Sequence, residues 1–312
     1  MAISPRIIRR RIKSVANTRK ITRAMELVAA AKMRRAVAAS QRSRAYAALA
    51  RDMLAHLATV TESGAHVLLA VKPVKRILLI VITSHRGLCG GFNANMLRRA
   101  VAQAKSPARM AVHRVAGSTD ILPAVDVFVD VVAVGRKGED AFRRAHVPVV
   151  ASFRIAGDLP VAAEARPIAQ LAMREFTEGK YEKVVVAYTD FISSLVQVPK
   201  FRQLLPISPV DMEKMLVGVE DAPVFSTQET IFEPDAARVL DQMLPRLVEV
   251  LTYQAMLESS ASEHSSRMLA MRNASDAAEE MIDDLTLTYN GARQAGITRE
   301  IAEIAAGSAA QE

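Results

Sequence analysis

The sequence predicts an α/β protein, with a long antiparallel coiled coil of N- and C-terminal helices plus a central Rossmann-like α/β domain. Two observations predict the coiled coil: residues 3–57 contain no glycine and a single proline, and residues 247–306 contain no proline. A third observation predicts the central domain. Between these segments, short apolar runs alternate with stretches of helical period, which is typical of a mainly parallel sheet covered by helices.

The amino-terminal segment is expected to form one helix over residues 3–57. Pro5 stands in the first turn, where a helix tolerates proline. Apolar or small residues recur in steps of three and four. They are Ile8, Ile12, Val15, Thr22, Met25, Ala29 and Ala36. A helix of this length would extend roughly 80 Å, so it must protrude from the domain or pair with a second helix.

The closing segment supplies that second helix over residues 247–306, and two terminal helices of similar length predict an antiparallel pair. Strict apolar heptads are not sustained, because many positions carry alanine or glycine. Pro245 is expected to start this helix or to kink it, and a shorter helix is expected to open at Pro234 and Asp235.

The central segment is expected to alternate strands and helices. The predicted strands are 77–83, 127–134, 147–150, 183–188 and an extended segment at 195–205, and the predicted helices are 92–104, 137–145 and 161–178. Residues 105–125 are interpreted as an insertion with a small strand at 110–115. The predicted domains are therefore 1–60, the amino-terminal helix; 70–206, the central α/β domain; and 207–312, a connecting segment and the carboxyl-terminal helix.

Composition narrows the possible functions of this 312-residue chain. Its one cysteine, Cys89, excludes an internal disulfide and any site with several thiolate ligands. The six histidines are scattered without metal-ligand spacing, so neither a metal nor a cofactor is predicted. No run approaches about 18 consecutive apolar residues, the length a membrane-spanning helix needs.

Charge is distributed unevenly along the chain. The net charge is +8, but residues 1–51 hold 14 Lys or Arg against Glu26 alone, whereas residues 207–312 hold 7 against 19 acidic residues. The terminal helices could therefore lie beside each other, face different partners, or present two solvated faces. A nucleic-acid-binding arm is the weaker reading, because Tyr46 is the one aromatic residue among the basic residues.

One glycine-rich segment follows a predicted strand and opens a predicted helix, where a phosphate-binding loop would lie. It runs from Ser84 to Gly91 and contains Gly87, Gly90 and Gly91. Its spacing matches neither the P-loop nor the dinucleotide fingerprint, which favours a structural tight turn over nucleotide binding. Cys89 lies four residues after His85, so a nucleophilic thiol is an alternative to a small buried residue.

Three motifs, in order along nearly the whole chain, resemble the gamma subunit of F-type ATP synthase. Arg10–Val15 with Asn17–Arg34 resembles the family's opening helix, Arg86–Asn93 resembles its central glycine loop, and Tyr289–Ile301 resembles its carboxyl-terminal signature. Three features depart from the family pattern: His85, Gly291 and the helix-interrupting Pro245. The insertion at 105–125 has no obvious counterpart either, and a plant-type regulatory insert with a cysteine pair is absent.

The resemblance implies a rotor without an active site of its own. In that family the terminal helices form a bent shaft inside a hexamer of three alpha and three beta subunits, and the α/β domain is a foot on the membrane c-ring. The implied partners are alpha, beta, epsilon and the c-ring, with no nucleic acid and no direct membrane span. The implied location is the cytoplasmic face of a bacterial plasma membrane, since the shaft motif starts within ten residues of Met1.

The resemblance also implies roles for individual residues. The implied beta-subunit contacts are Met25, Arg267, Gln294 and Thr298, and the implied foot positions near the ring are Lys32, Arg34 and Glu233. The alternative for Met25 is a residue that only fills the coiled-coil seam, and the alternative for Arg267 is an ordinary exposed charge. The competing function from another class is an α/β enzyme that uses the loop 84–93 and Cys89.

Overall fold

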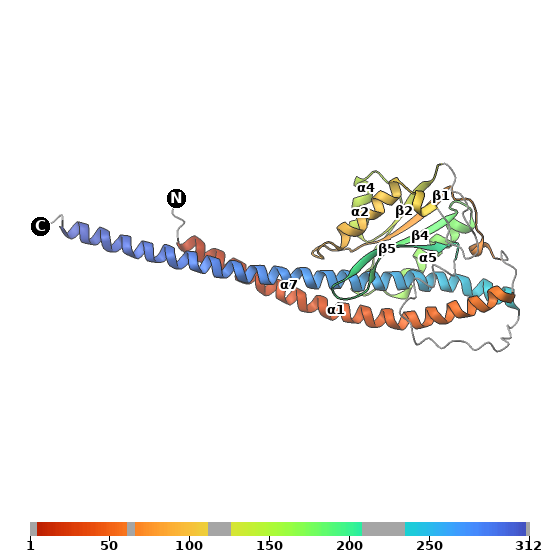
Figure 1. The fold of residues 1–312 in the computed structure, drawn as a ribbon, viewed down its shortest axis with the longest axis horizontal. Coiled ribbons are helices and arrows are strands. Elements are labelled where there is room, and N and C mark those ends of the chain that lie inside the picture. Colours follow the sequence, from red (N-terminus) through yellow and green to blue (C-terminus); the bar gives the residue numbers. More distant parts are fainter. Residues whose placement is uncertain (1–4, 61–65, 112–125, 208–234, 310–312) are drawn as a thin grey trace. The chain divides into compact units, whose positions relative to one another are not determined.

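The computed structural model describes residues 5–60, 66–111, 126–207 and 235–309 (Figure 1). The chain divides into two compact units. One unit combines residues 1–29 with 267–312, and the other is formed by residues 30–266. Helix α1 (Pro5–Val60) and helix α7 (Ala236–Ala309) each contribute to both units.

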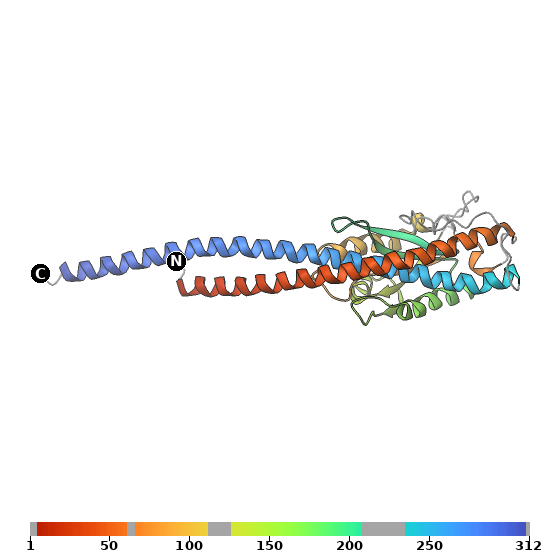
Figure 2. The same ribbon diagram turned by 90° about the horizontal axis from the view of Figure 1, so that it is seen from below.

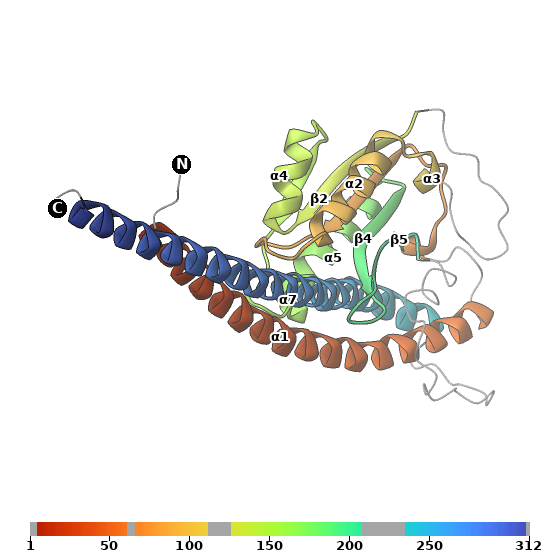
Figure 3. The ribbon, with the colours of Figure 1, turned by 60° about the vertical axis from the view of Figure 1, so that its left-hand side comes forward.

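A five-stranded sheet forms the centre of the second unit (Figure 3). Its strands are β1 (Arg76–Ile82), β2 (Phe128–Val134), β3 (Val149–Phe153), β4 (Lys183–Phe191) and β5 (Gln197–Leu205). The strand order is β3-β2-β1-β4-β5, with β5 antiparallel to β4 and every other pairing parallel. The predicted Rossmann-like, mainly parallel sheet is confirmed.

Helices cover both faces of this sheet, which explains why β1 is apolar from Ile77 to Ile82 without interruption. Ile77, Leu79 and Val81 face a core shared with α2 (Phe92–Lys105) and α4 (Arg136–Arg144). Leu78, Ile80 and Ile82 face the opposite core, shared with α5 (Ala162–Thr177), the short 3-10 helix η1 (Val67–Leu69) and the early part of α7. The side chains of β1 from Ile77 to Ile82 therefore alternate between two helical layers.

Two element predictions are wrong in their details. The small strand expected at 110–115 is not formed at its start, because Met110 and Ala111 belong to the short helix α3 (Ala108–Ala111), whose amides donate to the carbonyl of Pro107. Residues 112–125, most of the predicted insertion, lie outside the described residues. The strand expected at 147–150 instead runs from Val149 to Phe153, where main-chain pairing with β2 decides its limits.

Pro245 does not start a helix, which is one of the two alternatives expected for it. It lies inside α7, which begins at Ala236 and continues to Ala309 as one element. Proline removes a backbone hydrogen bond, but the turns around it bury a continuous apolar face in the core. The residues of that face are Leu240, Leu244, Leu247, Val248 and Leu251. Burial of these side chains compensates for the lost bond.

In the first unit, α1 and α7 form an antiparallel pair (Figure 2). Thr22 and Ser275 share a buried hydrogen bond of 2.7 Å, and Arg19 forms an ion pair of 2.7 Å with Glu279. The least exposed face of α7 here follows steps of four and three. Its residues are Met271, Ser275, Ala278, Ile282, Leu285, Tyr289 and Ala292. The packing therefore has heptad spacing. The sequence does not show this spacing as an apolar pattern, because several of these positions carry small or polar residues.

Candidate functional site

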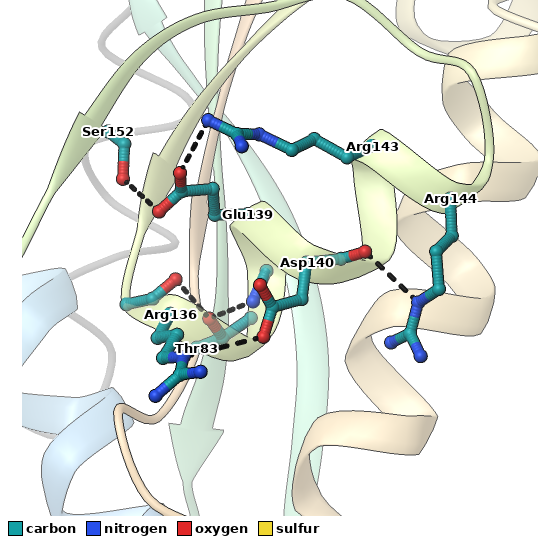
Figure 4. Close-up of polar contacts among 9 residues, drawn as sticks. Thr83, Arg136, Glu139, Asp140, Arg143, Arg144 and Ser152 are labelled. Carbon is teal, nitrogen blue, oxygen red and sulfur yellow. Dashed lines mark hydrogen bonds and ion pairs between the residues drawn. The ribbon is translucent and has the colours of Figure 1, made fainter.

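Thr83 follows β1 at the carboxyl end of the parallel strands, where a nucleotide phosphate would bind in a doubly wound fold (Figure 4). Its hydroxyl donates to the carbonyl of Val134 at 3.1 Å and accepts from the amide of Gly138 at 2.9 Å. A Cβ added at Gly135 would lie 2.2 Å from the Thr83 carbonyl oxygen, and Gly135 has φ +98°. The residues that follow β1 and β2 are therefore in direct contact, and only glycine fits at position 135.

Asn93 fastens the glycine loop to the end of β1. Its side-chain oxygen accepts from the amide of Ser84 at 3.1 Å, and its amide nitrogen donates to the Ser84 hydroxyl at 2.7 Å and to the Cys89 sulfur at 3.1 Å. The Cys89 side chain is buried, whereas His85 is exposed. The thiol therefore packs as a small interior group.

Two backbone amides that could bind a phosphate are already hydrogen-bonded within the chain. At the start of α4, the amide of Lys137 donates to the Ser84 carbonyl and the amide of Gly138 donates to Thr83. A phosphate at a helix start binds to such amides when they are free. The amides at the start of α4 are therefore already bonded. Within the loop 84–93, the Asn93 bonds and the buried Cys89 favour a structural turn over the nucleotide and nucleophile readings.

The three glycines singled out in the loop differ in what they do. Gly90 has φ +54°, which explains glycine there, while a Cβ at Gly91 would meet the Asn95 side chain at 3.1 Å. A Cβ at Gly87 would meet open space. Leu88 has φ +61° and a highly exposed side chain. A sequence pattern of glycines cannot reveal this strained leucine, because leucine rarely adopts that conformation.

Met25 and Arg267 both belong to the first unit, and both are half-buried. The antiparallel register set by Thr22 and Ser275 brings Met25 to the level of Met271, about one turn from Arg267. These two predicted contact residues are therefore neighbours along the pair. The first alternative, that Met25 belongs to the seam between the helices, agrees with its half-buried position.

Gln294 and Thr298 form a second position on α7. They are one helical turn apart, and both are exposed. Arg267 precedes Gln294 by 27 residues of continuous helix, a distance of roughly 40 Å. The structure therefore brings Gln294 and Thr298 together but separates this pair from Arg267.

The end of α7 carries an exposed apolar stripe. From Arg293 to Ala306 every residue is exposed, including Ile297 at 48%, Ile301 at 62% and Ile304 at 73%. The two terminal helices are expected to pair over similar lengths, but this end of α7 is uncovered within the described residues. Periodicity identifies an apolar helix face but cannot show whether α1 reaches far enough to cover it.

The predicted foot residues differ in their surroundings. Lys32 forms an ion pair with Asp158, with Nζ 2.7 Å from Oδ1, and this hydrogen bond lowers the pKa of the Asp158 carboxyl. His264 contacts the backbone oxygen of Asp158 at 3.0 Å, so the loop before α5 is joined to both α1 and α7. Arg34 is exposed, and Glu233 lies outside the described residues.

Neither a metal centre nor a membrane span is evident in the described part of the chain. No three His, Cys, Asp or Glu side chains within it are grouped to hold a metal ion. None of its helices combines the length and apolarity needed to cross a bilayer.

Comparison with known proteins gives a consistent result over the whole chain. A family model described as ATP synthase matches residues 4–310. The ATP synthase gamma chain of Dehalococcoides mccartyi strain CBDB1 is 42% identical over 307 residues, 98% of both chains. That of Stenotrophomonas maltophilia strain K279a is 40% identical over 308 residues, 98% of this chain and 99% of the relative.

Solved structures show a similar fold. A chain from the central stalk and c-ring of the Tetrahymena thermophila mitochondrial ATP synthase has a TM-score of 0.59 and 26% identity, covering 82% of this chain and 99% of that one. A chain from the OSCP/F1/c-ring structure of the Euglena gracilis mitochondrial ATP synthase has a TM-score of 0.64 and 16% identity, covering 98% and 94%.

Proposed function

The chain belongs to the ATP synthase gamma-chain family, and from that membership we propose that it is the central-stalk rotor subunit of an F-type ATP synthase. Its terminal helices, within 1–60 and 207–312, form the shaft, and its α/β domain, 70–206, forms the foot. The chain has no active site of its own in this account. It couples ion flow through the membrane c-ring to ATP synthesis or hydrolysis at the alpha and beta subunits by rotating.

The mechanism follows from the asymmetry of two unequal helices. Inside a ring of three alpha and three beta subunits, the α1–α7 pair presents a different surface to each beta subunit. Contacts that differ between beta conformations shift each subunit toward a different nucleotide affinity. Rotation driven by proton or sodium flow then changes the nucleotide affinity of each beta subunit in turn. Because the coupling is reciprocal, ATP hydrolysis can drive rotation in the opposite direction.

The exposed end of α7 is the observation that carries this proposal. Ile297, Ile301 and Ile304 follow one another at four and three residues on a helix that has no partner within the described residues over this stretch. An apolar stripe of this kind is typical of a surface that a second protein covers. The collar formed by the alpha and beta subunits is the partner that the family membership supplies.

The polar contact residues support two levels of interaction along the shaft. Gln294 and Thr298 lie beside the apolar stripe and can exchange hydrogen bonds with a beta-subunit loop. Met25 and Arg267 form the other level. By resemblance to the family, Met25 corresponds to the shaft position near an acidic lever of the beta subunit, and Arg267 corresponds, like Gln294 and Thr298, to a position that contacts a beta-subunit loop. Arg267 supplies a cation for that contact, and partial desolvation strengthens it relative to an exposed pair.

The foot residues support contact near the membrane. Lys32, Arg34 and Glu233 are assigned to foot positions near the c-ring, and the chain is proposed to be a peripheral protein on the cytoplasmic face of the bacterial plasma membrane. Lys32 also pairs with Asp158 and so joins the loop before α5 to α1, whereas Arg34 is exposed.

The proposal is tested by measuring ATP hydrolysis of purified alpha and beta subunits with and without this chain, beside the chain alone. Hydrolysis that rises sharply in the mixture, with co-elution of all three proteins, supports the rotor. Hydrolysis or tight nucleotide binding by the chain alone would instead support the enzyme alternative at residues 84–93 and Cys89.

A further inference from the structure

The two helical layers of the α/β unit carry very different charge. Helices α2 and α4, on one face of the sheet, together contain seven Lys or Arg and two acidic residues. Helix α5, on the opposite face, contains two of each. Helices α2 and α4 therefore have a net charge of +5, whereas α5 has none, so positive charge is concentrated on the α2/α4 side of the sheet.

Both acidic residues of the basic layer already have cationic partners (Figure 4). Glu139 accepts from Arg143 at 2.8 Å and also from the Ser152 hydroxyl, while Asp140 lies 3.6 Å from Arg136. The remaining cations have no carboxylate partner within the described residues. They are Arg98, Arg99, Lys105, Lys137 and Arg144, and all five are exposed.

Three of these arginines are held in place by the chain itself. Arg99 donates to the carbonyl of Pro199 on β5, and Arg144 donates to the carbonyl of Asp140. Arg98 donates to the side-chain oxygen of Asn95 at 3.4 Å. A guanidinium that is already oriented loses less conformational entropy on binding, and its planar donors match a carboxylate.

The exposed composition of this layer narrows the class of partner. Neither α2 nor α4 exposes a large apolar side chain, so the layer offers no anchor for insertion into a membrane. Its two aromatic residues, Phe92 and Phe142, are buried and provide no stacking platform for nucleic-acid bases. We propose that the α2/α4 face is a docking surface for an acidic segment of another protein, whose Asp and Glu side chains pair with these five cations.

This surface is separate from the contacts of the proposed rotor function and does not depend on them. Contacts between exposed charges are screened by salt, and they act more on the rate of association than on the lifetime of a complex. Binding at this face should therefore be fast and should weaken as salt is raised. If the face were only solvated, removing its positive charges would weaken binding of an acidic polypeptide no more than removing charges from other basic regions of the chain.

The test uses the full chain and fluorescently labelled poly-L-glutamate as an acidic polypeptide probe. Three variants are compared, and in each of them three Lys or Arg residues are replaced by glutamine. The face variant changes Arg98, Lys105 and Lys137; the opposite-face control changes Arg166, Arg174 and Lys180; and the α1 control changes Arg9, Arg10 and Lys13. We expect the face variant to weaken binding about tenfold at low salt, and by more than either control.

Carbodiimide cross-linking gives a second measurement that needs no variant, because it joins carboxylates to neighbouring lysine amines. In the wild-type chain, poly-L-glutamate should attach preferentially at Lys105 and Lys137. Equal losses in the face variant and the opposite-face control, or cross-links confined to α1, would overturn the proposal. It would also be overturned if the face variant lost binding to phosphatidylglycerol vesicles or duplex DNA while retaining binding to poly-L-glutamate.

Discussion

At the scale of single residues, Met25 is the most direct probe of how the shaft meets a beta subunit. It is half-buried on α1, in the unit that also contains Arg267. A lysine at this position would place a cation where the shaft moves past the acidic surface of beta. We predict that Met25→Lys lowers proton pumping per ATP more than it lowers assembly, as measured in membranes that contain the complex. Equal pumping efficiency in mutant and wild-type membranes would remove Met25 from the contact.

Gln294 and Thr298 test the proposed beta-subunit contact near the exposed end of α7. Replacing both with alanine removes two exposed polar side chains without altering the helix, since alanine favours it. We predict weaker activation of ATP hydrolysis in the reconstituted complex. Glu300→Ala with Glu303→Ala is the matched control, because it changes two other exposed residues of the same helical end. A rate unchanged from wild type in the Gln294 and Thr298 variant, or lowered equally in the control, would contradict the assignment.

Thr83→Val tests the hydrogen bonds that join the ends of β1 and β2 to the start of α4. Thr83→Val keeps the shape of the side chain but leaves the buried amide of Gly138 without its acceptor. We predict a loss of about 1–3 kcal/mol in the free energy of unfolding, measured with urea. Thr189→Val is the control, because the buried Thr189 hydroxyl has no hydrogen-bond partner among the described residues. That change should be neutral or slightly stabilising, and equal losses in both variants would count against the proposed role of Thr83.

At the scale of elements, His66 connects the start of η1 to α7. Its Nδ1 accepts from the amide of Leu68, and its Nε2 lies 3.4 Å from Asp241. Burial lowers the pKa of His66 below its ordinary value of 6.5, although the Asp241 charge opposes this effect. The unfolded chain therefore takes up the proton first as the pH falls. The stability contributed by neutral His66 is complete above pH 6.5 and is lost as the pH falls through the lower folded pKa.

His66→Asn isolates this effect, because asparagine can also cap η1 but does not titrate. Urea unfolding should be measured for both proteins at a pH well above and a pH well below 6.5. We predict that the wild type loses more stability between these two conditions than His66→Asn does. Equal losses would show that other groups cause the acid sensitivity.

The order of the elements follows from the sequence, whereas several limits and contacts do not. Uninterrupted apolar strands and long proline-poor segments predict the sheet and the terminal helices, because both patterns are local. Pro245 misleads because a local rule is overridden by burial of the apolar face around it. Thr83 and Gly135 meet across 52 residues, so no spacing rule could identify their contact. Asp158 contacts Lys32 in the same non-local way.

The candidate site depends even more on information beyond spacing. Met25, Arg267, Gln294 and Thr298 were assigned by resemblance, and their roles remain predictions. Their separation into two levels follows from the helix predicted over residues 247–306, which contains Arg267, Gln294 and Thr298 and forms part of α7. The exposed isoleucines after Arg293 were missed, because helical periodicity is the same for a covered and an uncovered face.

At the scale of the whole molecule, the account requires one property that no single residue supplies. The chain must turn as a rigid body within a ring of catalytic subunits, so that each beta subunit meets a different side of the shaft in succession. An active site within the chain is unnecessary for this role, and the buried thiol and closed glycine loop agree with that view.

Rotation itself is the most direct test. Because Cys89 is buried, Ala163→Cys on the exposed side of α5 provides a selective site for attaching a bead to the foot. With alpha and beta subunits immobilised around this chain, addition of ATP should turn the bead in one direction, with one stop for each beta subunit. A bead that shows only random motion, while the same complex hydrolyses ATP at the rate of wild type, would contradict the rotor account.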